Sequence, residues 1–302
     1  MSITFKEVEH IYAQDTPFAY HALKGVNLNI QKGSMTALIG HTGSGKSTLI
    51  QHLNGLVKAT SGTIYFNGQD IYDEDFDLRE LRNRVGLVFQ YPEHQLFETT
   101  IFDDVCFGPK NQGLSKEEAG LRAFEALRSV GLPEELYYQS PFDLSGGQKR
   151  RVAIAGVLAM KPEVLILDEP TAVLTPQETD ELFEQLLLLK KNDHTIIFIS
   201  HKIREVMQIC DNITVLRAGR TVGSIPVANA TEEDISRFMV GRDVILKMNK
   251  KPAEFGDTLL KVTDLTYENK EGRKLLDHVS FSLKKGQILG IAGVEGNGQN
   301  EL

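Results

Sequence analysis

A glycine-rich segment between an expected strand and an expected helix limits most tightly how this chain can fold. Residues 40–47 read GHTGSGKS and match the pattern G-x-x-x-x-G-K-[ST]. The preceding MTALI is typical of a buried strand, and the following TLIQHL is typical of a helix. In such a loop, backbone N–H groups and a helix N-terminus face phosphate groups. The sequence therefore predicts a nucleotide site within an α/β domain.

The residue types in this loop suggest its chemistry. The three glycines let the backbone approach the phosphates, Lys46 should reach the β- and γ-phosphates, and the Ser47 hydroxyl should hold Mg²⁺. The plain alternative, a glycine-rich turn before a helix, is disfavoured by the flanking strand and helix. An early aromatic residue could stack on adenine or simply pack in its strand. The expected nucleotide-binding residues are Gly40, His41, Thr42, Gly43, Ser44, Gly45, Lys46, Ser47, Thr48 and Tyr12.

Composition excludes several classes of protein. With 302 residues, 41% of them hydrophobic, the chain can bury one full domain and part of another. A net charge of −8 disfavours nucleic-acid binding through an overall positive field. The only cysteines, Cys106 and Cys210, lie far apart and indicate neither a disulfide framework nor a zinc site. We find no signal peptide and no run of 18 apolar residues, so other chains would have to span a membrane.

Strand-like and helical segments alternate along the chain, which is typical of an α/β domain. Residues 115–130 have apolar positions at helical spacing, and we expect an inserted helical subdomain at about 91–160. A helix over 232–240 is expected to be capped by Thr231. The expected strands are residues 26–30, 35–39, 63–66, 85–89, 164–167, 195–199 and 213–216.

Four polar residues follow expected strands and should meet at the carboxyl edge of a parallel sheet. Asp168 is expected to contact Mg²⁺ through water, and Glu169 to polarise the attacking water. Gln90 could place its amide on the metal or the water, and His201 could hold the γ-phosphate. Taken singly, each could be an ordinary solvated or packed side chain. Their order after a phosphate loop favours function.

The segment at 144–148 is the most specific motif, because it starts a helix expected over 148–160 with a capping serine and bare glycines that favour an anion. Its residues are Leu144, Ser145, Gly146, Gly147 and Gln148. With it, the chain resembles the ATP-binding subunits of ABC transporters, which have a P-loop NTPase fold. The resemblance implies Walker A at 40–47, the Q-loop Gln90, the signature at 144–148, Walker B at 164–168, the catalytic Glu169 and the switch His201. It also implies a head-to-tail dimer in which each signature meets ATP held by the other ATPase domain.

Different segments of the chain resemble two different types of ABC importer. Residues 90–97 and 107–115 resemble energy-coupling factor ATPases, which pair with a second ATPase, a membrane T component and substrate-binding S proteins to take up vitamins, cobalt or nickel. Residues 171–178, 200–206 and 239–243 instead resemble the tandem ATPases of nucleoside and simple-sugar importers, which work with permeases and a substrate-binding component. We therefore hypothesise a composite, with residues 1–170 of the first type and 171–302 of the second. Thr175 stands where the first type normally carries Asp in its D-loop.

The chain also repeats itself. Residues 279–286 repeat the pattern of 26–33 at an offset of 253 residues, which indicates the start of a second copy. We expect an ABC ATPase domain at 1–240, a linker at 241–257 and a truncated second domain at 258–302. In that copy Gln299 and Asn300 replace Lys46 and Ser47. The copy has about 45 residues, too few for a domain-sized core, so we expect the second ATPase domain to come from another chain.

These observations predict an ATP-hydrolysing importer subunit, peripheral at the cytoplasmic face of the cell membrane. The leading interpretation is energy-coupling factor transport of a vitamin or transition-metal ion, and the alternative is nucleoside or simple-sugar import. A soluble ABC ATPase of translation or DNA repair is disfavoured by the acidic balance and by the absence of a coiled-coil insertion. A chain that folds poorly and only binds nucleotide is the remaining alternative.

Overall fold

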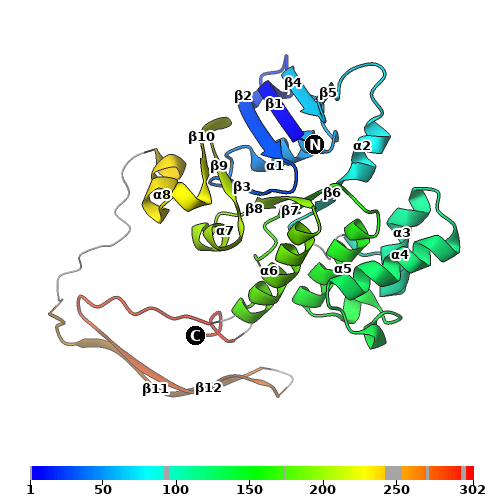
Figure 1. The fold of residues 1–302 in the computed structure, drawn as a ribbon. Coiled ribbons are helices and arrows are strands. Elements are labelled where there is room, and N and C mark those ends of the chain that lie inside the picture. Colours follow the sequence, from blue (N-terminus) through cyan, green and yellow to red (C-terminus); the bar gives the residue numbers. More distant parts are fainter. Residues whose placement is uncertain (1, 92–94, 173, 242–253, 270–271, 294–296) are drawn as a thin grey trace. The chain divides into compact units, whose positions relative to one another are not determined.

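The computed structural model describes residues 2–302 apart from 92–94, 173, 242–253, 270–271 and 294–296. The chain divides into two compact units, residues 1–244 and 245–302, and each is described by itself. The first unit holds two sheets and the helices around them (Figure 1).

The central sheet of the first unit has six strands in the order β10-β9-β3-β8-β7-β6. Its strands β3, β6, β7 and β8 are almost entirely buried, which explains their continuous apolar runs and fits parallel strands covered on both faces. Parallel pairing of β3 with β8, of β8 with β7 and of β7 with β6 brings their carboxyl ends to one edge. The strands are β3 (Met35–Ile39), β6 (Val85–Val88), β7 (Val164–Asp168), β8 (Thr195–Ile199), β9 (Asn212–Arg217) and β10 (Arg220–Pro226).

A second, antiparallel sheet has the strand order β2-β1-β4-β5. Its inner residues, such as Phe5 and Leu23, pack with residues of helix α1 and of the central sheet in one hydrophobic core. Helix α1 (Lys46–Leu53) contributes Leu49 and Leu53 to this core, and its first residue follows the glycine-rich loop directly. The strands are β1 (Ser2–Tyr12), β2 (Tyr20–Gln31), β4 (Ser61–Phe66) and β5 (Gln69–Asp70), and helix α2 (Leu78–Arg84) precedes β6.

Three helices within residues 101–158 stand beside the strands of the first unit, drawn in green in Figure 1. They are α3 (Ile101–Asn111), α4 (Lys116–Ser129) and α5 (Gly146–Leu158), with short 3-10 helices η2 (Glu134–Leu136) and η3 (Pro141–Asp143) before α5. Capping boxes fix the starts of α4 and α5, in which Ser115 pairs with Glu118 and Ser145 with Gln148. The expected helix over 148–160 therefore starts two residues earlier, because the cap places both glycines in its first turn.

A second hydrophobic core joins these helices to the central sheet and to the remaining helices. Those helices are α6 (Pro176–Lys191), α7 (Ile203–Ile209) and α8 (Glu232–Val240), with η4 (Val227–Asn229) before α8. Thr231 caps α8 as the sequence predicts, and its hydroxyl accepts a hydrogen bond from the backbone N–H of Asp234. Among the described residues, no helix is both long and apolar enough to cross a membrane.

The second unit contains a hairpin of β11 (Thr258–Glu268) and β12 (Lys274–Lys284). The two strands pair antiparallel, as β1 and β2 do at the start of the chain. The expected linker at 241–257 and the loop of the proposed second copy lie partly outside the described residues. The division into two copies stays a proposal.

Candidate active site

A cleft of about 310 Å³ lies in the first unit, where the glycine-rich loop meets the carboxyl ends of the central strands. It brings together side chains from segments up to 181 residues apart in the sequence, because β3, β6, β7 and β8 end at this edge. The described residues that line it are Tyr20, Ala22, Thr42, Gly43, Gly45, Lys46, Ser47, Thr48, Gln90, Asp168, Glu169 and His201.

The backbone of the glycine-rich loop adopts conformations that require glycine. Gly43 and Gly45 have φ angles of 79° and 103°, which side-chain-bearing residues rarely adopt. A Cβ on Gly40 would lie 2.3 Å from the Leu216 carbonyl oxygen, so this position has no room for a side chain. Helix α1 starts directly after Gly45, and its first N–H groups are therefore placed for an anion.

The side chain of Lys46 folds back onto the glycine-rich loop that precedes it. Its Nζ donates hydrogen bonds to the carbonyl oxygens of Gly40 at 2.6 Å and His41 at 3.2 Å. Burial lowers the pKa of Lys46, and the nearby carboxylates Glu169 and Asp168 oppose that shift. A phosphate group in the cleft would give this ammonium a stronger, oppositely charged partner.

Asp168 ends strand β7 and lies in the same cleft as Ser47 and Gln90. Burial raises the pKa of Asp168, and the neighbouring Glu169 raises it further, while Lys46 and Arg150 lower it. A partly buried carboxylate of this kind is stabilised by a cation. The carboxylate, hydroxyl and amide oxygens of Asp168, Ser47 and Gln90 are the ligand types that suit Mg²⁺. The three residues therefore fit the metal that the sequence predicts.

Glu169 and His201 are in direct contact. The Nδ1 of His201 lies 3.0 Å from each carboxylate oxygen of Glu169, and the imidazole is exposed whereas Glu169 is buried. Glu169 has a φ of 47°, in the left-handed region that a non-glycine residue seldom occupies. Its backbone N–H donates to the Ile199 carbonyl at 3.0 Å, which ties this residue to the end of β8.

Two tyrosines lie near the loop, and the sequence singled out only one of them. Tyr12 is not among the described residues that line the cleft, but its hydroxyl donates to Thr48 Oγ1 at 3.2 Å. Tyr20, which starts β2 and is 56% exposed, does line the cleft together with Ala22. Sequence reasoning missed Tyr20 because it precedes the apolar positions that identified its strand.

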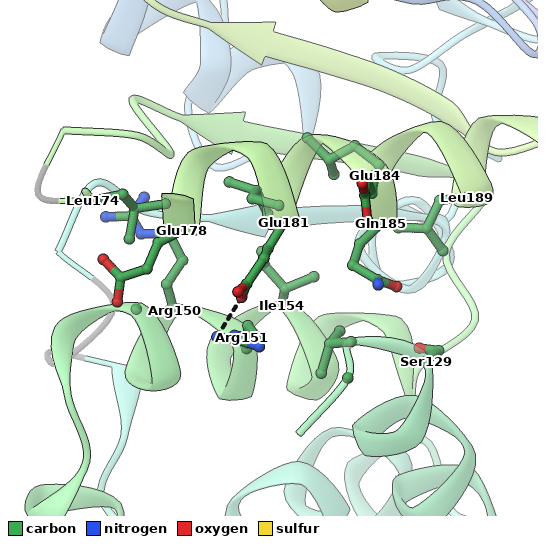
Figure 2. Close-up of a pocket in the computed structure, with 15 residues that line it drawn as sticks. Ser129, Arg150, Arg151, Ile154, Leu174, Glu178, Glu181, Glu184, Gln185 and Leu189 are labelled. Atoms are coloured by element: carbon green, nitrogen blue, oxygen red, sulfur yellow. Dashed lines mark ion pairs between the residues drawn. The ribbon is translucent and has the colours of Figure 1, made fainter. Parts of the chain in front are cut away.

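The signature segment lies at a different place. None of its residues is among the described residues that line the cleft. Gly147 instead lines a cavity of about 270 Å³ bounded by α5, α6 and residues 129–131 (Figure 2). A Cβ on Gly147 would lie 2.2 Å from Glu178 Oε1, because this carboxylate caps α6 directly above the signature helix. Gly147 therefore permits α5 and α6 to approach closely.

A lysine and a glutamate connect the segments that follow β7 and β8. Lys202, next to His201, donates to the carbonyl oxygen of the buried Thr171 at 3.0 Å and pairs with Glu205 at 2.9 Å. The Thr171 hydroxyl donates to the same Glu205 carboxylate at 2.5 Å. Sequence reasoning did not identify this network, because residues 171–178 and 200–206, which contain its members, indicated only a resemblance and no contact between them.

Comparison with known proteins gives the family. Residues 23–172 match the family model "ABC transporter". The chain is 51% identical over 235 residues to the energy-coupling factor transporter ATP-binding protein EcfA2 of Clostridium perfringens, covering 77% of this chain and 82% of that protein. This match runs past residue 170, where the sequence suggests a change of resemblance, and the composite origin stays a hypothesis.

Two solved structures have the same fold. One is cbiO1 from Clostridium perfringens, part of the ABC transporter complex cbiONQ, with a TM-score of 0.70, 41% identity and coverage of 78% of this chain and 92% of that one. The other is a dimeric post-hydrolysis state of the ATP-binding cassette MJ0796 bound to ADP and Pi, with a TM-score of 0.66, 30% identity and coverage of 74% and 98%. The chain therefore belongs to the ABC transporter ATP-binding family, and among these relatives it is similar to energy-coupling factor ATPases.

Proposed function

We propose that this chain binds ATP with Mg²⁺ and hydrolyses it as one ATPase subunit of an energy-coupling factor transporter. The observation that carries the proposal is the cleft in which Lys46, Glu169 and His201 converge. The signature segment is absent from the described lining of that cleft, so it remains available to a second ATPase subunit in a head-to-tail dimer. That arrangement is the one implied by the family resemblance.

In this proposal each side chain has one role in the reaction. The loop N–H groups, with Thr42 and Ser44 in that loop, and Lys46 bind the β- and γ-phosphates, and Thr48 lies beside them in the first turn of α1. Ser47, Gln90 and Asp168 would hold Mg²⁺, which would supply charge neutralisation at the phosphate oxygens. Glu169 polarises the attacking water and accepts its proton, while the contact with His201 fixes the orientation of the carboxylate.

The helical subdomain offers a surface for a membrane partner. Phe97 and Phe107 are 57% and 41% exposed, and their rings meet edge to face at 4.8 Å. They line a groove of about 140 Å³ with Val157 of α5 and with Met160, two residues after the end of that helix. Phe102 of α3 is partly buried and packs against the second hydrophobic core. We propose that the groove receives a coupling segment of a T-type membrane component, which would keep the chain at the cytoplasmic face of the membrane.

Isolation of the assembled complex tests this proposal against its alternatives. The tagged full-length chain is recovered from detergent-solubilised membranes, and its partners are identified by mass spectrometry. We expect a second ATPase and a T-type component, and we expect their recovery to fall when Phe97→Glu and Phe107→Glu are combined. Recovery of two sugar-type permeases, or of ribosomes without a membrane protein, would contradict the proposal. Uptake of labelled vitamins, cobalt and nickel into vesicles carrying the complex then identifies the transported class.

A further inference from the structure

Arg150 lies in the interior of the first unit, six residues after the start of the signature segment. It belongs to α5 and is 1% exposed. Arginine is almost never fully buried unless its charge and its N–H groups have partners. Its burial at this position therefore has a specific structural cause.

The guanidinium contacts two backbone carbonyls of the candidate active site. Its Nη2 donates to the carbonyl oxygen of Gln90 at 2.6 Å, and its Nη1 donates to the carbonyl oxygen of Glu169 at 3.2 Å. Gln90 and Glu169 follow the neighbouring parallel strands β6 and β7. The planar guanidinium thus spans the gap between two strand ends, which the single ammonium group of a lysine does less well.

The contact with Glu169 falls on a strained part of the backbone. Glu169 has its left-handed φ of 47°, and such a conformation persists only where the surroundings hold it. Its N–H is held by Ile199, and its carbonyl oxygen is held by Arg150. Both backbone polar groups of Glu169 are therefore hydrogen-bonded, and its side-chain carboxylate contacts His201.

We propose that Arg150 is a positioning residue for ATP hydrolysis, which links the signature helix α5 to the backbone of Gln90 and Glu169. Through this link, a shift of α5 against the central sheet changes the orientation of the Glu169 carboxylate. The inference rests on the proposed function, because it assigns Glu169 to the hydrolytic step.

The neighbouring arginine shows that the contact is specific to Arg150. Arg151 points toward α6 and pairs with Glu181 of that helix at 3.0 Å, whereas the side chain of Arg150 extends toward Leu174 (Figure 2).

A matched control is Arg122 in α4. It also joins two parts of the helical subdomain, since its Nη1 donates to Gln112 Oε1 at 3.2 Å, but it touches no active-site residue among the described residues.

Steady-state ATPase measurements on the assembled complex test the proposal with Arg150→Gln, Arg150→Lys and Arg122→Gln. A misplacement of about 1 Å in an active site can lower a rate about 100-fold. We expect kcat of Arg150→Gln to fall by about this factor, and KM for ATP to change by less than about threefold, because the phosphate loop is untouched. Arg150→Lys should recover part of the loss, and Arg122→Gln should retain the wild-type kcat.

A combination with Glu169→Asp, which keeps a carboxylate and a measurable residual turnover, separates positioning from a general structural role. If Arg150 acts through Glu169, Arg150→Gln should lower kcat by a smaller factor in the Glu169→Asp background than in the wild type. A full, multiplicative further loss, or a wild-type kcat in folded Arg150→Gln, overturns the inference. If Arg150→Gln does not fold, Arg150→Lys decides, and a wild-type kcat together with a raised KM in that variant also overturns it. A wild-type complex without ATPase activity would contradict the proposed function instead.

Discussion

At the scale of single residues, the active site depends on groups held away from their preferred states. Lys46 is bound to loop carbonyls, Asp168 is partly buried beside another carboxylate, and Glu169 has an unfavourable backbone conformation. In the proposed function, each of these features would be relieved or used on binding of a triphosphate and a cation in the cleft. The motifs predicted which residue types meet here, because each type serves a distinct part of the chemistry.

A buried histidine near the loop should make the stability of the protein depend on pH. His52 in α1 is fully buried; its Nδ1 lies 2.7 Å from the Thr48 carbonyl, and its ring meets that of His10 at a centroid distance of 4.8 Å. Burial lowers the pKa of His52, the hydrogen bond to Thr48 opposes this, and His10 lowers it further. Burial also lowers the pKa of His10, whose Nδ1 lies 3.2 Å from the Lys58 carbonyl.

The unfolded chain therefore takes up protons first as the pH falls through about 6.5, and stability is lost below that value. We expect the urea concentration at the unfolding midpoint of the wild type to decrease when the pH is lowered from about 7.5 to about 5.5. In His52→Gln, whose amide still offers a donor to the Thr48 carbonyl, this decrease should be smaller. His41→Gln, at an exposed position, is the control. Equal slopes for His52→Gln and the wild type would show that the buried imidazole is not responsible.

At the scale of elements, helix α5 must pack closely on strand β6. A Cβ on Gly86 would lie 2.2 Å from Val157 Cγ1 and 3.3 Å from Pro162, so the helix approaches the strand only because residue 86 has no side chain. Gly156, in the same helix, has no atom within 4 Å of the corresponding position. The two glycines therefore allow a paired comparison.

Gly86→Ala should destabilise the protein by about 1–3 kcal/mol through overpacking of this contact. Gly156→Ala should instead leave stability unchanged or raise it by up to about 1 kcal/mol, because alanine is the better helix former. Denaturant unfolding of the isolated chain measures both effects. The close packing of α5 on β6 is refuted if Gly86→Ala proves as stable as the wild type.

The sequence predicted the buried strands better than the partly exposed ones. All seven expected strands overlap strands of the structure. Four of them, β3, β6, β7 and β8, are the continuous apolar runs that are typical of parallel strands buried on both faces. Strand β10 was not predicted, because it contains Gly223 and Pro226. Strand β1 was expected only as the strand of Tyr12, without bounds, because it mixes charged and apolar residues.

The candidate site shows a similar limit. Its motif residues could be predicted, because loop chemistry and strand ends imply contacts between them. Arg150 and Tyr20 could not, since burial of an arginine in α5 and the exposure of a tyrosine at the start of β2 depend on packing between elements distant in sequence.

At the scale of the whole molecule, the first unit carries both an ATP cleft and a signature segment that lies outside the described lining of that cleft. In the dimer proposed above, the cleft of one subunit would be completed by the signature of another. Thr175 still caps α6, with its hydroxyl accepting a hydrogen bond from the Glu178 N–H at 3.3 Å. Threonine at position 175, where energy-coupling factor ATPases normally carry Asp, therefore still caps helix α6.

The central claim is that Lys46 binds ATP and that Glu169 activates the water that attacks it. Equilibrium binding of labelled ATP and its turnover are measured together for wild type, Lys46→Ala and Glu169→Gln, each assembled with the partner ATPase. We predict that Lys46→Ala abolishes binding, and that Glu169→Gln binds ATP as the wild type does, stops turnover and accumulates as an ATP-bound dimer on a sizing column. Normal hydrolysis by Glu169→Gln would contradict the account.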